Sequence, residues 1–180
     1  MSFRHLSLIV ALISLAGCSL KIHAGNPRPN IAIATRDSTM ALVIADQVAN
    51  DFAFRQQNGI MGGSVQGWHT TLRAGFSNGF SDAFQLREAP AETTMSIDVA
   101  ELEFVPAAVS GYYGVVAVVA QVRFKATVTQ GGVKRRVAGT AVSKKSIASR
   151  NEVTAGTVSA VESMYEAIAR ELFSDSARRD

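Results

Sequence analysis

The chain has 180 residues, with 18 lysines and arginines against 15 aspartates and glutamates, and its single cysteine is Cys18. One cysteine excludes an intramolecular disulfide, so packing alone has to hold the fold. The length fits one domain with a modest core once the N-terminal segment is set apart.

The N-terminal segment has three parts. A short basic region, residues 1–5, precedes eleven nearly apolar residues, Leu6–Ala16. This run matches a signal-peptide core and is too short to span a bilayer. It leads into a short motif that ends in cysteine: Leu15, Ala16, Gly17 and Cys18. The motif resembles the lipobox of bacterial lipoproteins, in which a peptidase cuts before a cysteine that is acylated. The alternative is an ordinary secretory signal, with Cys18 either removed or left as a free thiol.

The lipobox resemblance implies a mature chain that begins at Cys18. That residue would carry a diacylglycerol and an N-linked acyl chain such as palmitate, and two or three chains anchor a protein stably. Residues 1–17 would be the signal peptide, residues 18–30 the lipidated cysteine and a proline-containing tether, and residues 31–180 one periplasmic domain. Ser19, where many inner-membrane lipoproteins carry aspartate, implies the inner leaflet of the outer membrane. Export to the periplasm also excludes nucleic acid as a partner.

The segment Met40–Gln57 is ambiguous between helix and strand. Five apolar residues would share one helical face: Leu42, Ala45, Val48, Ala49 and Phe52. The run Leu42–Ile44 is instead typical of a β-strand, and the periodicity slightly favours the helix. Residues 58–67 are rich in glycine and are predicted to be a loop, without the Gly-Lys-Ser/Thr ending of a phosphate-binding loop.

A helix is predicted over Val65–Phe84 because large apolar residues recur every three or four positions. They are Val65, Trp68, Leu72, Phe76, Phe80 and Phe84. Such a stripe is typical of a core-facing helix rather than a ligand site. Ser64 is a candidate N-cap, and Gly75 and Gly79 indicate close packing on a sheet, since the helix is too polar to insert in a membrane.

The second half of the sequence predicts a β-meander followed by a helix. Alternation over Met95–Phe104 changes parity near Ala100, which indicates a bulge there. A long strand over 112–128 turns at two glycines into a partner strand over 133–149. A final helix over 152–173 has a buried stripe of Val161, Met164, Ile168 and Leu172. The predicted fold is α+β, with an antiparallel sheet of about four strands and two helices on one face.

Three patches carry a resemblance to a known family: "VIADQ", "MSIDVAELEF" and "VSAVESMYEAIARELFSD". Together with the lipobox and the order of elements they resemble the YajG-type bacterial lipoproteins, and similar layouts occur in auxiliary lipoproteins of envelope ABC transporters. The resemblance implies that Met40–Val48 is a strand rather than a helix. It supplies no catalytic residues.

No motif in the chain predicts an enzyme. The mature chain has two histidines, His23 and His69, and lacks a Gly-x-Ser-x-Gly elbow, a His-Glu-x-x-His motif and any metal-ligand spacing. Glu101 and Glu103 share one strand face, which alternation on a solvated face explains. We therefore expect no catalytic residue, no metal and no cofactor besides the acyl groups on Cys18.

Charge is the most unusual local feature. Between residues 121 and 150 the chain has eight basic residues and no acidic one: Arg123, Lys125, Lys134, Arg135, Arg136, Lys144, Lys145 and Arg150. They would form a patch for phospholipid headgroups, an acidic partner or anionic glycolipid, or else a solvated hairpin face that discourages aggregation. The expected function is docking onto an envelope protein as a non-catalytic accessory. The alternative is lipid or glycolipid handling within an envelope transport system, which requires an apolar groove.

Overall fold

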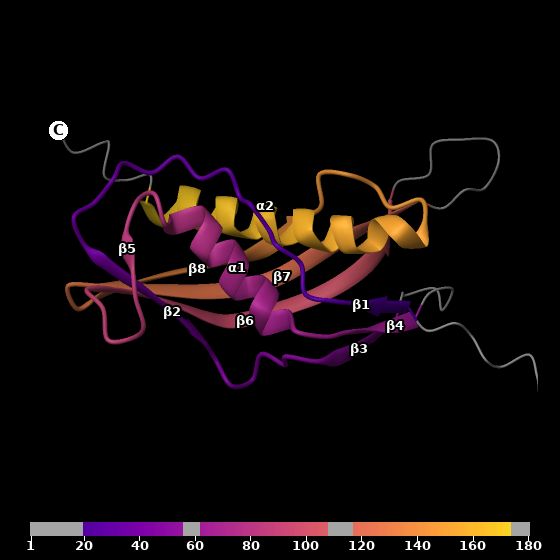
Figure 1. Ribbon diagram of the computed structural model, residues 1–180, viewed down its shortest axis with the longest axis horizontal. Helices are drawn as coiled ribbons and strands as arrows, with labels where there is room; N and C mark the ends of the chain where they lie inside the picture. The colour runs from indigo at the N-terminus through magenta and orange to yellow at the C-terminus, as the bar shows by residue number, and fades with distance from the viewer. Residues whose placement is uncertain (1–19, 56–61, 108–116, 174–180) are drawn as a thin grey trace, which may run out of the picture.

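The computed structural model describes residues 20–55, 62–107 and 117–173. The strands are β1 (Leu20–Ile22), β2 (Thr39–Ile44), β3 (Phe52–Arg55), β4 (Gly62–Val65), β5 (Gln85–Leu86), β6 (Thr93–Pro106), β7 (Val118–Gln130) and β8 (Val133–Val142). The helices are α1 (Trp68–Phe80), a 3-10 turn η2 (Arg150–Glu152) and α2 (Val153–Phe173). Figure 1 shows both α-helices lying over one face of a long sheet.

The main sheet has five strands in the order β5-β2-β6-β7-β8. Strand β2 runs parallel to both β5 and β6, whereas β6, β7 and β8 form an antiparallel meander. The α+β class and the two helices are confirmed, but the expected antiparallel sheet of about four strands is wrong in detail. The chain reaches β6 from β2 through α1, and a crossover of this kind makes neighbouring strands parallel.

Strand β2 settles the ambiguity of the early segment. The helix favoured by the periodicity is wrong, and the strand implied by the family resemblance is confirmed over Thr39–Ile44. Met40 and Ala41 are fully buried between neighbouring strands. An interior strand is apolar on both faces, so its sequence resembles a helix stripe as much as an alternating strand.

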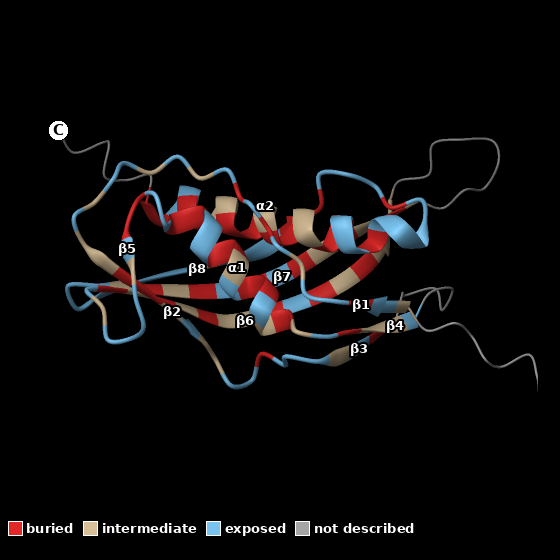
Figure 2. Ribbon diagram, viewed as in Figure 1, coloured by how far each residue is buried: buried red, intermediate tan, exposed pale blue. Residues whose placement is uncertain are grey.

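The bulge predicted near Ala100 is present two residues earlier. The pairing of β6 with β7 shifts register between Ile97 and Val99, which leaves Asp98 as the extra residue. Because of this shift, Met95 and Ile97 before the bulge and Ala100 after it are all buried beneath the helices. Figure 2 shows the resulting alternation of buried and less buried residues along β6 and β7.

The ends of the meander differ from the expected ranges. Strand β7 begins at Val118, and residues 112–116 of the predicted strand lie outside the described residues. Strand β8 ends at Val142 rather than near 149. The chain then bends, and Ile147 returns to bridge Val118. The segment after β8 thus closes the end of the sheet instead of extending it.

Helix α1 is shorter than predicted. It begins after Gly67, whose φ of 71° is left-handed, and Ser64 provides no cap. Val65 belongs to β4 and Phe84 follows the helix, although both are buried as the stripe predicted. Helix α2 matches its predicted range and packs on β7 and β8 with the expected buried stripe. The two helices meet where the buried Tyr165 hydroxyl donates to the Leu72 carbonyl over 2.8 Å.

A second, three-stranded sheet of order β1-β4-β3 covers one end of the helix-facing side. Strand β4 lies within the range predicted to be a loop, and β1 pairs with it in parallel. The ring of Phe54 in β3 lies 4.8 Å from the ring of Phe104 in β6. Each of these strands has only three or four residues, and β4 begins with two glycines, so none of them has a recognisable alternation in the sequence.

The segment expected to be a tether packs on the domain. Ile22 in β1 is only 1% exposed, and Pro27 and Pro29 are buried. The backbone N–H groups of Arg28 and Asn30 donate to glutamates of α2 over 2.9 and 3.1 Å. From Leu20 onward the chain thus lies within the folded domain, where a tether was expected.

Candidate functional site

The predicted lipidation site lies outside the described residues. This applies to Cys18 and to the cleavage motif Leu15, Ala16 and Gly17. The anchor therefore stays a prediction from the sequence. The structure adds only that β1 begins at Leu20, two positions after the cysteine.

The basic residues predicted as one patch are divided between surfaces. Lys134 and Arg136 pair across from Thr129 and Thr127, so they share the face of the sheet opposite the helices with Arg123 and Lys125. Arg135 lies on the other face, where its guanidinium donates to the Leu172 carbonyl near the end of α2 over 3.3 Å.

The remaining basic residues lie beyond β8. Lys144 forms an ion pair with Glu166 of α2 at 2.8 Å, and Lys145 is exposed on the loop that returns to β7.

Arg123 of β7 is neutralised by Glu101 and approaches Glu103 at 4.0 Å. The hydrogen bond to Glu101 raises the pKa of Arg123 above its ordinary value. Three basic residues of the helix-free face make no ion pair within the described parts of the chain, and we call them the open-face cations: Lys125, Lys134 and Arg136.

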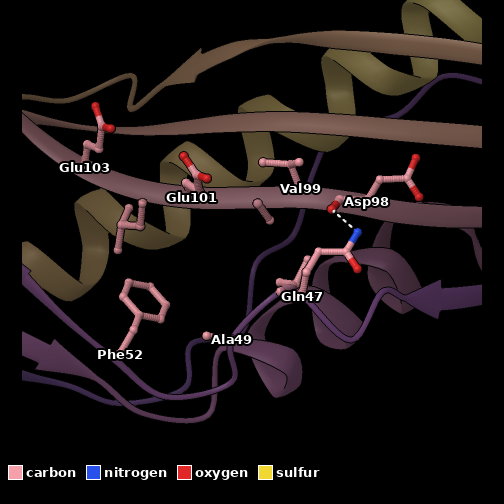
Figure 3. A pocket seen from close by; sticks show the side chains of 10 residues that line it. Gln47, Ala49, Phe52, Asp98, Val99, Glu101 and Glu103 are labelled. Atoms are coloured by element: carbon pink, nitrogen blue, oxygen red, sulfur yellow. Dashed lines mark hydrogen bonds between the residues drawn. The ribbon is translucent and has the colours of Figure 1, made fainter.

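A different feature, a groove beside β6, is a second candidate site. Strand β2 pairs with β6 only as far as Ile97, while β7 pairs with β6 along its whole length to Pro106. Over residues 99–106, no other described strand is paired with the edge of β6 that β2 leaves. The groove next to this edge has a volume of about 420 Å³. It is closed on the other side by the segment between β2 and β3 (Figure 3).

Where the open edge of β6 begins, at Asp98 and Ala100, side chains instead of a strand bond the backbone carbonyls. Gln47 Nε2 donates to the Asp98 carbonyl and Trp68 Nε1 donates to the Ala100 carbonyl, both over 3.0 Å. The Trp68 ring is fully buried and meets Phe52 edge-on, with ring centroids 6.0 Å apart. Trp68 and Phe52 therefore form a well-packed side of the groove. The part of the β6 edge after Ala100 has no such hydrogen-bond partner within the described residues.

Asp98 fixes the geometry of β6 at the groove. As the bulge residue it presents its carboxylate to the neighbouring strand, where it accepts hydrogen bonds from Thr127 Oγ1 at 2.7 Å and Ser96 Oγ at 2.6 Å. Figure 3 shows Glu101 and Glu103 on the opposite side of the β6 ribbon from Phe52 and Ala49. The groove thus has an apolar wall and an acidic rim.

The histidine weighed as a catalytic candidate has a structural environment. The Nε2 atom of His69 lies 2.6 Å from the Val48 carbonyl, and its backbone N–H donates to Asn50 Oδ1 over 3.0 Å. These contacts hold the groove wall onto α1. Across residues 20–55, 62–107 and 117–173, no three side chains of histidine, cysteine, aspartate or glutamate are grouped so as to hold a metal ion. Neither α-helix in these ranges combines the length and apolar character needed to cross a membrane.

The groove was not predicted, although the sequence contains one signal of it. The change of parity near Ala100 marks the point at which β6 bends, and the groove begins at that bend. The other wall could not be found in this way, because it depends on where β2 stops relative to β6. Glu101 and Glu103, assigned to a solvated face, are confirmed as neighbours on that face and also form the rim.

Comparisons with known proteins identify no family. No family model matches the chain, and no curated protein matches it significantly. A solved structure of protein XCC0632 from Xanthomonas campestris, described under family DUF330, aligns at 15% identity and a TM-score of 0.48, covering 88% of this chain and 94% of its own. A second structure, described as an uncharacterized protein, aligns at 12% identity and a TM-score of 0.49, covering 86% and 99%. The resemblance to YajG-type lipoproteins is not confirmed by either likeness.

Proposed function

We propose that this chain is a bacterial envelope lipoprotein, anchored by acylated Cys18, that docks onto a partner protein without catalysing a reaction. The anchor is supported by the motif Leu15–Cys18 at the end of an apolar run. Ser19 supports the inner leaflet of the outer membrane, with the domain facing the periplasm. The order of elements suits the YajG-type lipoproteins and the accessory lipoproteins of envelope transporters.

The unpaired edge of β6 carries the docking proposal. An exposed strand edge binds an extended segment of another protein by adding it to the sheet, with main-chain hydrogen bonds for affinity and side-chain pockets for specificity. Such a segment would pair with β6 after Ala100, because Gln47 and Trp68 already bond the carbonyls of Asp98 and Ala100. The groove would receive its apolar side chains at Phe52, while Glu103 would favour a lysine or arginine, since Glu101 is already paired with Arg123.

The alternative is lipid handling, and the apolar wall of the groove is the observation in its favour. Val48, Phe52 and Leu102 line the groove and suit a hydrocarbon chain. The rim disfavours this alternative: Glu101 and Glu103 share one ion-pair partner, Arg123, and so keep a net negative charge that repels the phosphate of a phospholipid headgroup. A protein segment satisfies both the apolar wall and the acidic rim, so docking is the better-supported function.

Photo-crosslinking in cells tests the proposal. A photoreactive residue at Ala49, which is exposed on the groove wall, should capture one dominant envelope protein. The same residue at Gln130, exposed at the end of β7 that pairs with Thr93 far from the groove, is the matched control and should capture none. Mass spectrometry of both protein and lipid decides between the functions. Phospholipid or glycolipid enriched at Ala49 without a stoichiometric protein would support lipid handling, and equal capture at both positions would contradict the groove as the docking site.

A further inference from the structure

The distance between the acylated cysteine and the folded domain is very short. Leu20 is already in β1, which is paired with β4, and Ile22 of the same strand is buried. Only Ser19 separates this strand from Cys18. An extended chain covers at most about 3.6 Å per residue, so Leu20 lies within about 7 Å of the anchored residue. A free tether over residues 18–30 would instead allow roughly 45 Å.

The end of the domain that holds β1 also carries unpaired positive charge. Lys21, Lys145 and Arg150 are exposed and make no ion pair within the described residues. The nearby carboxylate of Glu152 is already occupied, because it accepts the backbone N–H groups of Ala148 and Ser149 over 2.7 and 3.2 Å. Glu101 and Glu103 lie farther in along β6 and share Arg123 as a partner, so the exposed charge at this end is mainly positive and complements an anionic lipid surface.

From the short connection and this charge, we propose that the β1 end of the domain rests on the membrane surface that holds Cys18. Lys21, Lys145 and Arg150 then contact the anionic phospholipid headgroups. This inference rests on the proposed acylation of Cys18, but it does not depend on the docking partner.

The orientation places the rest of the domain away from the bilayer. Figure 1 shows β1 and the start of α2 at one end of the molecule and the turn between β7 and β8 at the opposite end. The 13 residues of β7 span about 43 Å. Lys134 and Arg136 near that turn are therefore out of reach of the headgroups, whereas the groove lies in the half of β6 nearer the membrane.

Fluorescence quenching on vesicles tests the orientation. The full-length acylated protein is placed in phosphatidylglycerol-containing vesicles with a headgroup-linked quencher, and a fluorophore is attached to a single introduced cysteine. Ser146→Cys, exposed at the β1 end, should be quenched severalfold more than Gln130→Cys, exposed at the far end. Equal quenching of the two positions in acylated protein would overturn the orientation while leaving the anchor intact.

Variants separate the contributions of length and charge. An insertion of about twenty glycines and serines after Ser19, which spans roughly 25 Å as a flexible coil, should remove most of the difference between the two probes. Combined reversal of the three basic residues at the β1 end to glutamate should also lower the quenching at Ser146. The matched control is reversal of the open-face cations, Lys125, Lys134 and Arg136, which should leave it unchanged.

The remaining outcomes are each decisive. Unchanged quenching after reversal at the β1 end would overturn the headgroup contact. Mass spectrometry that finds no diacylglycerol on Cys18 would overturn the anchor and the orientation together. Neither result changes the crosslinking test of the groove, so a failure of docking and a failure of this inference remain distinguishable.

Discussion

Two glycines of α1 set how closely the N-terminal segment and α2 approach this helix. A Cβ atom on Gly75 would lie 2.8 Å from the ring of Tyr165 and 3.3 Å from Pro27. On Gly79 it would lie 2.7 Å from Pro29. The pair predicted from the sequence to permit close packing does so against a second helix and the N-terminal segment, not against the sheet.

Substitution of either glycine by alanine should therefore destabilise the protein. We expect Gly75→Ala and Gly79→Ala each to lower the free energy of unfolding by about 1–3 kcal/mol, because the added methyl overpacks a rigid contact. Urea unfolding measures the change. Gly139→Ala, on the exposed strand β8, is the control, since its Cβ would lie at an ordinary 3.4 Å from the ring of Phe124 in β7. If all three variants were equally stable, the close approach would not matter for stability.

Tyr165 should make stability depend on pH in alkaline solution. Burial raises the pKa of its phenol above the ordinary value, with a smaller opposing effect of Arg73. The unfolded chain ionises this group near pH 10 while the folded chain keeps it neutral, so stability present below pH 10 is lost above it by about 1.4 kcal/mol per pH unit. In Tyr165→Phe this loss of stability above pH 10 should disappear. The variant should instead be less stable by about 1 kcal/mol at every pH, because it lacks the hydrogen bond to the Leu72 carbonyl. Urea midpoints at pH 9, 10 and 11 measure both effects, and parallel pH profiles would contradict the assignment.

At the scale of the elements, the sequence predicted those whose pattern is local. The meander of β6, β7 and β8 and the helix α2 have long periodic runs, and their order and buried faces were correct. The parallel pairing of β2, the short β1 and β4 and the packed prolines depend on contacts between distant segments. Periodicity carries no information on such contacts. The groove could not be predicted for the same reason, because its walls come from two distant segments, residues 47–52 and 98–103.

The bulge in β6 provides a test at this scale. Asp98→Ala removes two short hydrogen bonds, to Ser96 and Thr127, and should lower the free energy of unfolding by about 1–3 kcal/mol. It should also speed hydrogen exchange at the amides of β6 beside the groove. Asp82→Ala, at an exposed position just after α1, is the control and should change neither quantity. Unaltered exchange in Asp98→Ala would show that the bulge holds its shape without the carboxylate.

At the scale of the whole molecule, β8 is the outermost strand of the main sheet and is ten residues long. Long outer strands invite pairing between copies, and lysine or arginine on them discourages it. The same charges that were expected to form a patch thus have a direct physical role on this strand.

Replacing Lys134 and Arg136 together by threonine should therefore increase self-association. Threonine favours the strand and removes the charge, so we expect light scattering to rise with protein concentration in the double variant. Replacing Lys21 and Lys145 by threonine is the control, because Lys145 lies outside any strand and Lys21 lies in β1 of the other sheet. Equal scattering from both double variants would indicate a general effect of net charge.

For the exported lipoprotein proposed above, the contacts of the N-terminal segment with α2 bear on secretion. The N–H groups of Arg28 and Asn30 bond to Glu162 and Glu166, more than 130 positions later in the chain. The first residues to leave the export channel therefore obtain these partners only after nearly the whole polypeptide has followed. In the proposed lipoprotein, a nascent chain that stalls before α2 would leave the segment after Cys18 uncovered, so proteases could distinguish unfinished molecules from complete ones there.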